Sequence, residues 1–233
     1  YFFRKNDNLL HFVKPVFDRR VFLKTCTNGS SELMTNLSMS LVNALYNLQL
    51  MKIAGENGVA AYGAVMYVNF IFVATFLGYA IGCAPVISYH YGAGNHAELK
   101  NLYKKSMSII LVWGVILFGA AQLLAPVLSK IFVGYNTGLY AMTLHGFRVY
   151  AIAFLIIGIN IFGSSFFTAL NNGLISAVIS FLRTLVFQVI MVLTLPLWFG
   201  INGIWSAISI AEALTLIMTT TFFVRQKDKY HYL

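Results

Sequence analysis

The stretch that decides the fold is Thr25-Cys-Thr-Asn-Gly-Ser-Ser-Glu-Leu-Met-Thr-Asn-Leu-Ser-Met-Ser-Leu-Val-Asn-Ala-Leu-Tyr-Asn-Leu-Gln49. It is an apolar run that carries a row of polar residues spaced mainly at i+4, namely Asn28, Glu32, Asn36, Ser40, Asn43 and Asn47. At about 100° per residue, the row falls within roughly 120° on one side of a helix. Leucines occupy the other side, at Leu33, Leu37, Leu41, Leu45 and Leu48. The stretch therefore predicts a helix with one polar and one apolar side.

The charge of this stretch indicates where the helix lies. Glu32 is its only charged residue, whereas a surface helix of a soluble protein carries several charges on its polar side. The pattern predicts a membrane-spanning helix whose polar side faces a water-filled cavity. An ionisable group inside a membrane is costly and usually marks a functional position. The alternative is that Glu32 only hydrogen-bonds a neighbouring helix.

The composition extends this conclusion to the whole chain. Of 233 residues, 59% are hydrophobic and 10% are charged, against about 25% charged in soluble domains. The chain is therefore predicted to be an integral protein of the cell membrane, in contact with the lipid bilayer. Although the net charge is +9, its distribution argues against nucleic acid as a partner.

The basic residues gather in three places. They are Arg4, Lys5, Lys14, Arg19, Arg20 and Lys24 before the first span, Lys100, Lys104 and Lys105 in one connection, and Arg225, Lys227 and Lys229 in the tail. The opposite connections hold only Lys52 and Lys130. By the positive-inside rule, this asymmetry predicts that both termini are cytoplasmic. No cleavable signal peptide is evident at the start of the sequence.

Six apolar segments are long enough to cross the bilayer, which takes roughly 20 helical residues. They lie near residues 25–50, 59–90, 104–133, 140–170, 174–197 and 201–224. The predicted fold is all-α, a polytopic bundle of six transmembrane helices. The predicted organisation is a basic cytoplasmic linker or interfacial segment at 1–24, the six-helix transmembrane unit at 25–224, and a cytoplasmic tail at 225–233.

The second segment contains a candidate hinge. Gly78 and Gly82 form a GxxxG pair, which lets another helix approach closely, and Pro85 removes a backbone donor and bends a helix. This combination fits either a moving part or a static packing kink. Beyond it, Asn95 followed by Glu98 predicts the start of a helix with a side-chain cap.

Further polar residues lie in the later segments. Asn160, Ser164 and Thr168 form a second i+4 series in the fourth segment. The sixth segment contains Glu212, the other acid placed at membrane depth. Pairing with an arginine of another helix, Arg148 or Arg183, is the structural interpretation of this acid.

Several segments in combination resemble multidrug and toxic compound extrusion (MATE) transporters. The run Ala84-Pro-Val-Ile-Ser-Tyr-His-Tyr-Gly-Ala-Gly-Asn95, with Glu98-Leu-Lys100 and Ser106, resembles a recurrent segment of that family. Similar matches are Leu124-Ala-Pro-Val-Leu-Ser-Lys-Ile-Phe132, residues 160–172 with 176–183, and Phe199-Gly-Ile-Asn-Gly-Ile-Trp205. The resemblance covers essentially the whole chain.

The resemblance implies more than the residues alone. Members have twelve helices in two lobes, and this chain looks like the carboxy-terminal lobe, with the amino-terminal six-helix lobe as its missing partner. Glu32 falls where many members carry an acid linked to Na⁺ or proton coupling. In the fourth segment some members have a second acid, but Asn160 stands in a neighbourhood without a carboxylate. A cation site of two acids is therefore not expected.

The functional hypothesis is antiport of small cationic or amphipathic drugs against Na⁺ or H⁺. No phosphate-binding loop, metalloprotease motif or nucleophile elbow is present in the sequence, so we expect no enzyme and no cofactor. The candidate cavity residues are Asn28, Glu32, Asn36, Asn43 and Asn160, whose oxygens suit hard cations. Candidate adaptable surface residues for substrates are Met34, Met39, Tyr46, Tyr67 and Phe70. For each of them, the alternative is a lipid-facing position or packing in the core. The alternatives are a flippase for lipid-linked substrates and an inactive half-unit that needs the missing lobe.

Overall fold

The computed structural model describes residues 17–232, and every element within that range is helical. Inside the first helix, the side chains of Asn28, Ser31, Glu32, Met34 and Thr35 lie outside the description. The same holds for residues 1–16, which include most of the predicted linker.

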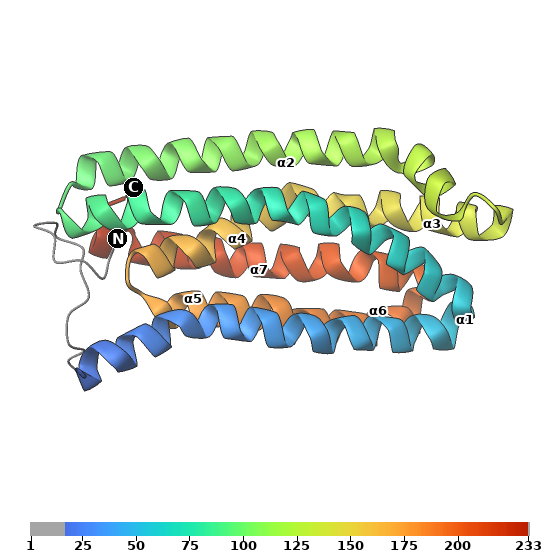
Figure 1. The fold of residues 1–233 in the computed structure, drawn as a ribbon, viewed down its shortest axis with the longest axis horizontal. Helices are drawn as coiled ribbons and strands as arrows, with labels where there is room; N and C mark the ends of the chain where they lie inside the picture. Colours follow the sequence, from blue (N-terminus) through green and yellow to red (C-terminus); the bar gives the residue numbers. More distant parts are fainter. Residues whose placement is uncertain (1–16, 233) are drawn as a thin grey trace, which may run out of the picture.

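The first helix, α1 (Arg19–Gly92), contains two membrane spans. It begins at Asp18, whose carboxylate accepts hydrogen bonds from the backbone N–H groups of Arg20 and Val21. The helix reverses at Gly55, whose φ of 62° and ψ of −154° are the only non-helical angles inside it. Figure 1 shows α1 running to the far end of the bundle and folding back. The reversal needs a residue that tolerates positive φ, which glycine does without strain.

The remaining spans follow in order along the chain. They are α2 (His96–Val133), then α3 (Thr137–Tyr150) with η1 (Ala151–Ala153) and α4 (Phe154–Ala169), then α5 (Gly173–Phe181) with η2 (Leu182–Phe187) and α6 (Gln188–Phe199), and finally α7 (Ile201–Tyr230). Here η1 is a 3₁₀ turn and η2 a π-helical turn. Five helices of the described chain are long and apolar enough to cross a membrane, and α1, which folds back at Gly55, is long enough for two of the six predicted crossings. The predicted helical membrane bundle is confirmed.

Asparagine side chains cap three of the helices. The carbonyl oxygens of Asn95, Asn136 and Asn172 accept hydrogen bonds from backbone N–H groups in the first turns of α2, α3 and α5. An asparagine in this position satisfies a donor that the helix itself cannot. The predicted cap at Asn95 is confirmed, and it starts α2 eight residues before the predicted span.

The span made of α3, η1 and α4 is the most buried of the bundle. It packs against α1, α2 and α7, while α4 also packs against α5. Glycines allow this close packing: Gly146 lies against the ring of Trp205, Gly158 against Phe76 and Gly163 against Thr219. Small residues at such contacts let helix backbones approach one another in membranes. The interior of the bundle is therefore centred on α4.

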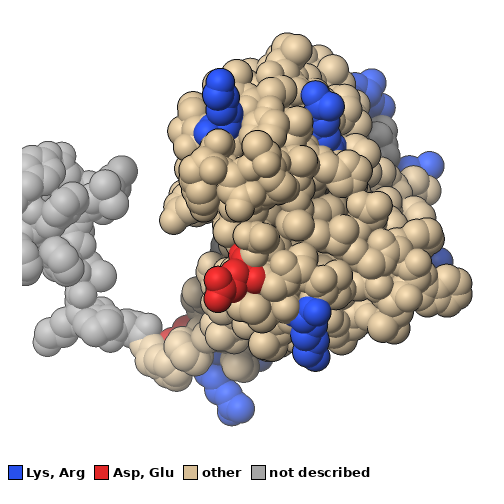
Figure 2. All heavy atoms as spheres, turned by 90° about the vertical axis from the view of Figure 1, so that its right-hand side faces the viewer, with Lys and Arg blue, Asp and Glu red and all other residues tan. Residues whose placement is uncertain are grey.

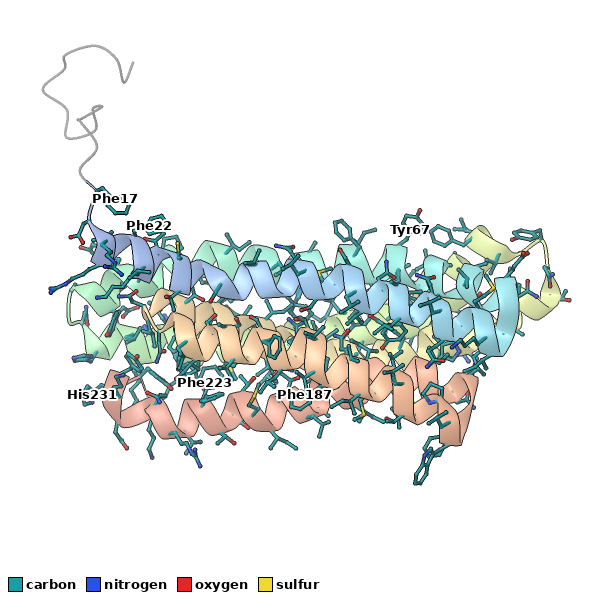
Figure 3. The ribbon with its side chains drawn as sticks, turned by 90° about the horizontal axis from the view of Figure 1, so that it is seen from below. Phe17, Phe22, Tyr67, Phe187, Phe223 and His231 are labelled. Atoms are coloured by element: carbon teal, nitrogen blue, oxygen red, sulfur yellow. The ribbon has the colours of Figure 1, made fainter. Side chains whose placement is uncertain are left out.

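Both ends of the described chain lie at the same end of the bundle (Figure 1). In Figure 3, Phe17 and Phe22 at the start of α1 lie at the same end as Phe223 and His231. This arrangement agrees with an even number of spans. Figure 2 looks onto the opposite end, where the basic side chains stand apart from one another. The strongly basic segments of the sequence are thus not gathered at that face.

Candidate ion and substrate site

The first half of α1 is packed along a single seam. Its buried residues are spaced at i+4 and are Ser38, Val42, Tyr46 and Leu50. The polar side at Asn36, Ser40 and Asn43 is exposed, and so are the leucines at positions 33, 37, 41 and 48. Two sides of this span are therefore open in the bundle, one leucine-rich and one polar. The leucine side suits lipid, whereas the polar side does not.

The polar side of α1 carries mainly neutral amides and hydroxyls in the part that is described. Asn47 donates its side-chain N–H to the backbone carbonyl of Asn43 at 2.9 Å and to its side-chain carbonyl at 3.3 Å. Asn28 and Glu32 continue the same helical row, but their side chains lie outside the described residues. The structure thus brings Asn36 and Asn43 to one open surface and leaves the position of the Glu32 carboxylate as a prediction.

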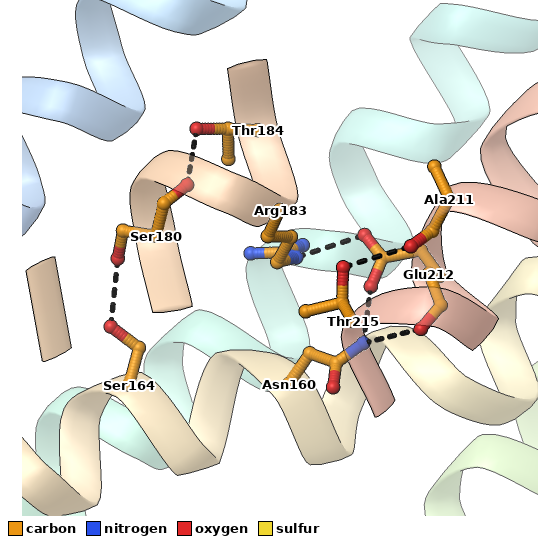
Figure 4. Close-up of polar contacts among 8 residues, drawn as sticks. All are labelled: Asn160, Ser164, Ser180, Arg183, Thr184, Ala211, Glu212 and Thr215. Carbon is orange, nitrogen blue, oxygen red and sulfur yellow. Dashed lines mark hydrogen bonds and ion pairs between the residues drawn. The ribbon is translucent and has the colours of Figure 1, made fainter. Parts of the chain in front are cut away.

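Asn160 lies elsewhere, in the interior of the bundle. Its side chain is fully buried and donates to the backbone carbonyl of Glu212 at 2.9 Å and to Glu212 Oε2 at 2.7 Å (Figure 4). Its described hydrogen bonds go to α7 and not to the polar side of α1. Of the predicted cavity residues, Asn36 and Asn43 therefore lie on an exposed surface, whereas Asn160 lies in the buried interior.

Glu212 forms an ion pair across two helices. Arg183 donates from Nε to Glu212 Oε1 at 2.9 Å, and the exposed fractions of the two side chains are 14% and 1%. A carboxylate with so little access to water needs a positive partner and hydrogen bonds to remain ionised. The predicted interhelical ion pair is confirmed, with Arg183 as the arginine; Arg148 is exposed.

We name the set Asn160, Arg183 and Glu212 the buried centre. Its arginine lies in η2, where the backbone follows a π-helical turn. Such turns are rare and occur frequently at functional sites. The sequence predicted Arg183 as one of two possible partners of Glu212, but the spacing of residues does not reveal a π-helical turn.

Two tyrosines, Tyr46 and Tyr150, are buried in the interior of the bundle. Tyr46 is 3% exposed and its ring stacks on Tyr62 with centroids 5.0 Å apart. Among the described residues, neither the Tyr46 hydroxyl nor Asn160 Oδ1 has a hydrogen-bond partner, although both are buried. The prediction that Tyr46 offers surface to substrates is wrong, because its ring fills the interior.

The other candidate surface residues lie outside. Tyr67 and Phe70 are 69% and 72% exposed, and Met39 is also exposed. Tyr67 projects from the bundle in Figure 3 and stacks on Phe132 with centroids 6.0 Å apart. The side chain of Met34 is outside the described residues.

A cluster of hydroxyls joins α4 to α5. Ser164 Oγ lies 2.8 Å from Ser180 Oγ and 2.9 Å from Ser176 Oγ, and Thr168 Oγ1 lies 2.6 Å from Ser176 Oγ. Thr184 donates to the backbone carbonyl of Ser180 at 2.6 Å (Figure 4). These contacts join two helices, as polar groups commonly do in membranes. The fifth-span members of this cluster were not predicted, although positions 176, 180 and 184 repeat at i+4.

The candidate hinge faces outward. Gly78, Gly82 and Pro85 are exposed, and no atom lies within 4 Å of the position a Cβ would take at either glycine. The backbone of α1 stays helical at Pro85. Within the described bundle no helix uses the GxxxG pair for close packing, so its role as a hinge or contact remains a prediction.

An open groove of about 370 Å³ runs between the start of α1 and the fifth span. Its lining residues are Thr27, Ser30, Leu174, Ala177, Val178, Phe181 and Leu182. The lining is mainly apolar, and it borders the turns of α1 that contain Asn28 and Glu32. In the part of the chain that the structure describes, no three His, Cys, Asp or Glu side chains gather as metal ligands.

Comparisons with known proteins agree on the fold. The chain superposes on a solved MATE in complex with MaL6 with a TM-score of 0.88 at 20% identity, covering 100% of this chain and 53% of that chain. An outward-facing multidrug resistance MATE family transporter of the MOP superfamily gives 0.86 at 21% identity, covering 98% and 52%. A MOP superfamily transporter from Pyrococcus furiosus Vc1 gives 0.86 at 20%, covering 98% and 52%.

The chain thus spans about half the length of these solved chains. No curated protein matches it in sequence. The MatE family model matches residues 33–194, which is well over half of the sequence and includes Asn36 to Asn47 of the polar side of α1, the candidate hinge glycines and Arg183. The chain therefore belongs to the MatE family of membrane transporters.

Proposed function

We propose that the chain is the carboxy-terminal lobe of a secondary antiporter that exports cationic, lipophilic compounds in exchange for Na⁺ or H⁺. The observation that carries this proposal is the exposed polar side of the first half of α1, at Asn36, Ser40 and Asn43. A bundle built only to sit in lipid would bury such groups, because polar side chains facing acyl chains are unfavourable.

The polar side needs a covering surface, and a second lobe would supply it. The solved chains that share this fold are about twice as long. A cavity between two lobes would then be lined on this side by α1 and bordered by the apolar groove along α5. Alternating access in transporters of this kind is largely rocking of one bundle against another around a site near the midplane.

Glu32 is the group we propose for coupling. It continues the row of Asn36 and Ser40, and the open side of α1 carries no arginine or lysine between residues 25 and 51. A carboxylate beside neutral amide oxygens can hold a proton, a Na⁺ ion or a cationic substrate, each in place of another. Competition for this one acid would couple the ion gradient to export.

The polarity of the open side also favours one substrate class. One of the similar solved transporters is described as having a binding pocket of reverse polarity that suggests a different function. Here the described open side is neutral, and the half-buried cation Arg183 is paired with Glu212. A flippase for phosphate-bearing lipids would need several unpaired cations, so positively charged compounds are the better-supported cargo.

The test is export of a fluorescent cationic dye by the full-length protein, in vesicles with Na⁺ and pH gradients imposed separately. We expect Glu32→Gln to abolish gradient-driven export. The matched control is Glu56→Gln, which neutralises an exposed acid beside the reversal of α1 and should export normally. Normal export by well-expressed Glu32→Gln would remove this residue from the mechanism.

A further inference from the structure

We infer that Arg183 takes the place of an exchangeable cation at the buried acid Glu212, so that the buried centre holds a fixed charge and not a transported one. This inference rests on the proposed function, because it assigns ion exchange to the open side of α1 alone. It makes Arg183 the residue that determines how many cation sites the lobe has.

The oxygen atoms of the buried centre resemble the ligands of a hard cation. Glu212 supplies a carboxylate, and Asn160 places an amide beside it. Carboxylate, amide and hydroxyl oxygens are the ligands that such cations prefer. Without a positive charge, these groups would surround a carboxylate that is 1% exposed.

The orientation of the Asn160 amide supports this inference. Its nitrogen donates to both the backbone carbonyl and Oε2 of Glu212. These two acceptors fix the amide, since only the nitrogen can donate. Oδ1 is thereby left buried and without a donor among the described residues, as is the Tyr46 hydroxyl. Asn160 therefore gives Glu212 only neutral donor contacts, and the compensating positive charge comes from Arg183.

Arginine provides that charge permanently. A guanidinium stays protonated in proteins, whereas a bound Na⁺ or proton can leave. Nε of Arg183 lies 2.9 Å from the carboxylate, and the π-helical turn η2 sets its direction. A charge tethered by the backbone neutralises Glu212 in every state of the transport cycle. The guanidinium of Arg183 then prevents Na⁺ and H⁺ from binding to Glu212.

The experiment measures Na⁺ binding by the purified chain in detergent, with ²²Na⁺ and by thermal unfolding in NaCl against choline chloride. We expect Arg183→Gln to bind about one Na⁺ per chain more than the wild type. At about ten times the dissociation constant of that site, Na⁺ should raise its unfolding temperature by about 4 °C beyond any wild-type shift. Arg183→Lys keeps the charge and should show neither gain.

The double variant Arg183→Gln/Glu212→Gln keeps the inference testable if Arg183→Gln does not fold. It replaces the ion pair with neutral amides of similar shape and should bind as much Na⁺ as the wild type. The inference is overturned if folded Arg183→Gln gains no Na⁺, or if the double variant loses one Na⁺ relative to the wild type. Neither readout depends on dye export, so the proposed function and this inference can fail separately.

Discussion

Two regions of the bundle are built from the same side-chain types and differ in what surrounds them. The open side of α1 presents amides and a hydroxyl at Asn36, Ser40 and Asn43, all exposed. The buried centre places an amide, Asn160, against the carboxylate of Glu212 with almost no access to water. Residue type therefore does not separate the proposed transport surface from a structural contact. The two regions are distinguished by their access to water and by the presence of a fixed counter-charge.

The difference has an energetic basis. At the buried centre, a charge without its partner would lie unpaired in a low-dielectric interior, which is energetically costly. The stability of each group therefore depends on the presence of the others. On the open side, each polar group can exchange one partner for another at little cost. Substitutions should therefore reduce stability at the buried centre and reduce transport on the open side.

The largest effect is expected from Glu212→Gln. This change leaves the Arg183 guanidinium unpaired in the interior and should lower the free energy of unfolding by about 3–5 kcal/mol. Thermal unfolding in detergent measures it, with exposed Glu56→Gln as the control that stays at the wild-type value. The double variant Arg183→Gln/Glu212→Gln should recover most of the loss. A double variant as unstable as the single one would contradict the ion pair as the cause.

A smaller effect is expected where the spans pack most tightly. A Cβ at Gly146 would lie 2.5 Å from Cε2 of Trp205, and a ring cannot bend away as a flexible chain end can. Gly146→Ala should cost about 3 kcal/mol, the upper part of the usual range for overpacking. The matched control is Gly78→Ala on the exposed face of α1, where nothing lies within 4 Å. If Gly146→Ala and Gly78→Ala lowered the free energy of unfolding equally, the close contact with Trp205 could not be the cause of the loss at Gly146.

The third prediction compares the two regions directly. Asn160→Ala removes two hydrogen bonds to Glu212 and should lower the free energy of unfolding by about 2 kcal/mol. Asn43→Ala changes an exposed amide and should stay within about 0.5 kcal/mol of the wild type. In the full-length protein, dye export should respond in the reverse sense, falling with Asn43→Ala at normal stability. If Asn43→Ala lowered the free energy of unfolding as much as Asn160→Ala, the proposed difference between the two regions would be contradicted.

Most of the fold could be predicted from the sequence because the bilayer demands about 20 apolar residues per span. Helix ends were predicted less well. The helix α2 starts at His96 and not near 104, because Lys100, Lys104 and Lys105 lengthen it beyond its apolar part. Between the first two predicted spans, residues 52–58 were expected to form a connection. The chain is helical there except at Gly55, where it reverses direction. Hydropathy locates the part of a helix that contacts lipid and does not locate its capped ends.

The candidate site was only partly predictable. Periodicity identified the polar side of α1 and the Asn160 series, because each lies within one helix. It gave Glu212 two possible arginines, since Arg183 lies 29 residues away and sequence spacing does not reveal which spans are neighbours. It also could not show that Tyr46 points inward, because an aromatic residue suits both lipid and the interior.

The smallest effect is expected at a buried hydroxyl near the end of the chain. Tyr232 is fully buried beyond α7, and its hydroxyl donates to the backbone carbonyl of Phe223 at 2.9 Å. Tyr232→Phe keeps the ring, which packs against Tyr103 and Phe166, and removes one hydrogen bond. The free energy of unfolding at pH 8 should fall by about 1 kcal/mol. Tyr135→Phe, at a side chain that is 82% exposed, is the control and should not change it.

The same tyrosine predicts a dependence on pH. Burial raises the pKa of the Tyr232 phenol above its ordinary value, and the charges of Tyr103 and Tyr230 add to this. An unfolded chain would ionise the phenol near pH 10, so the stability it contributes is complete below that pH and declines as pH rises toward the folded value. Between pH 8 and 11, the unfolding temperature of the wild type should therefore fall more steeply than that of Tyr232→Phe. Parallel curves would mean that this hydroxyl reaches water, and that the buried end of α7 is as open as the polar side of α1.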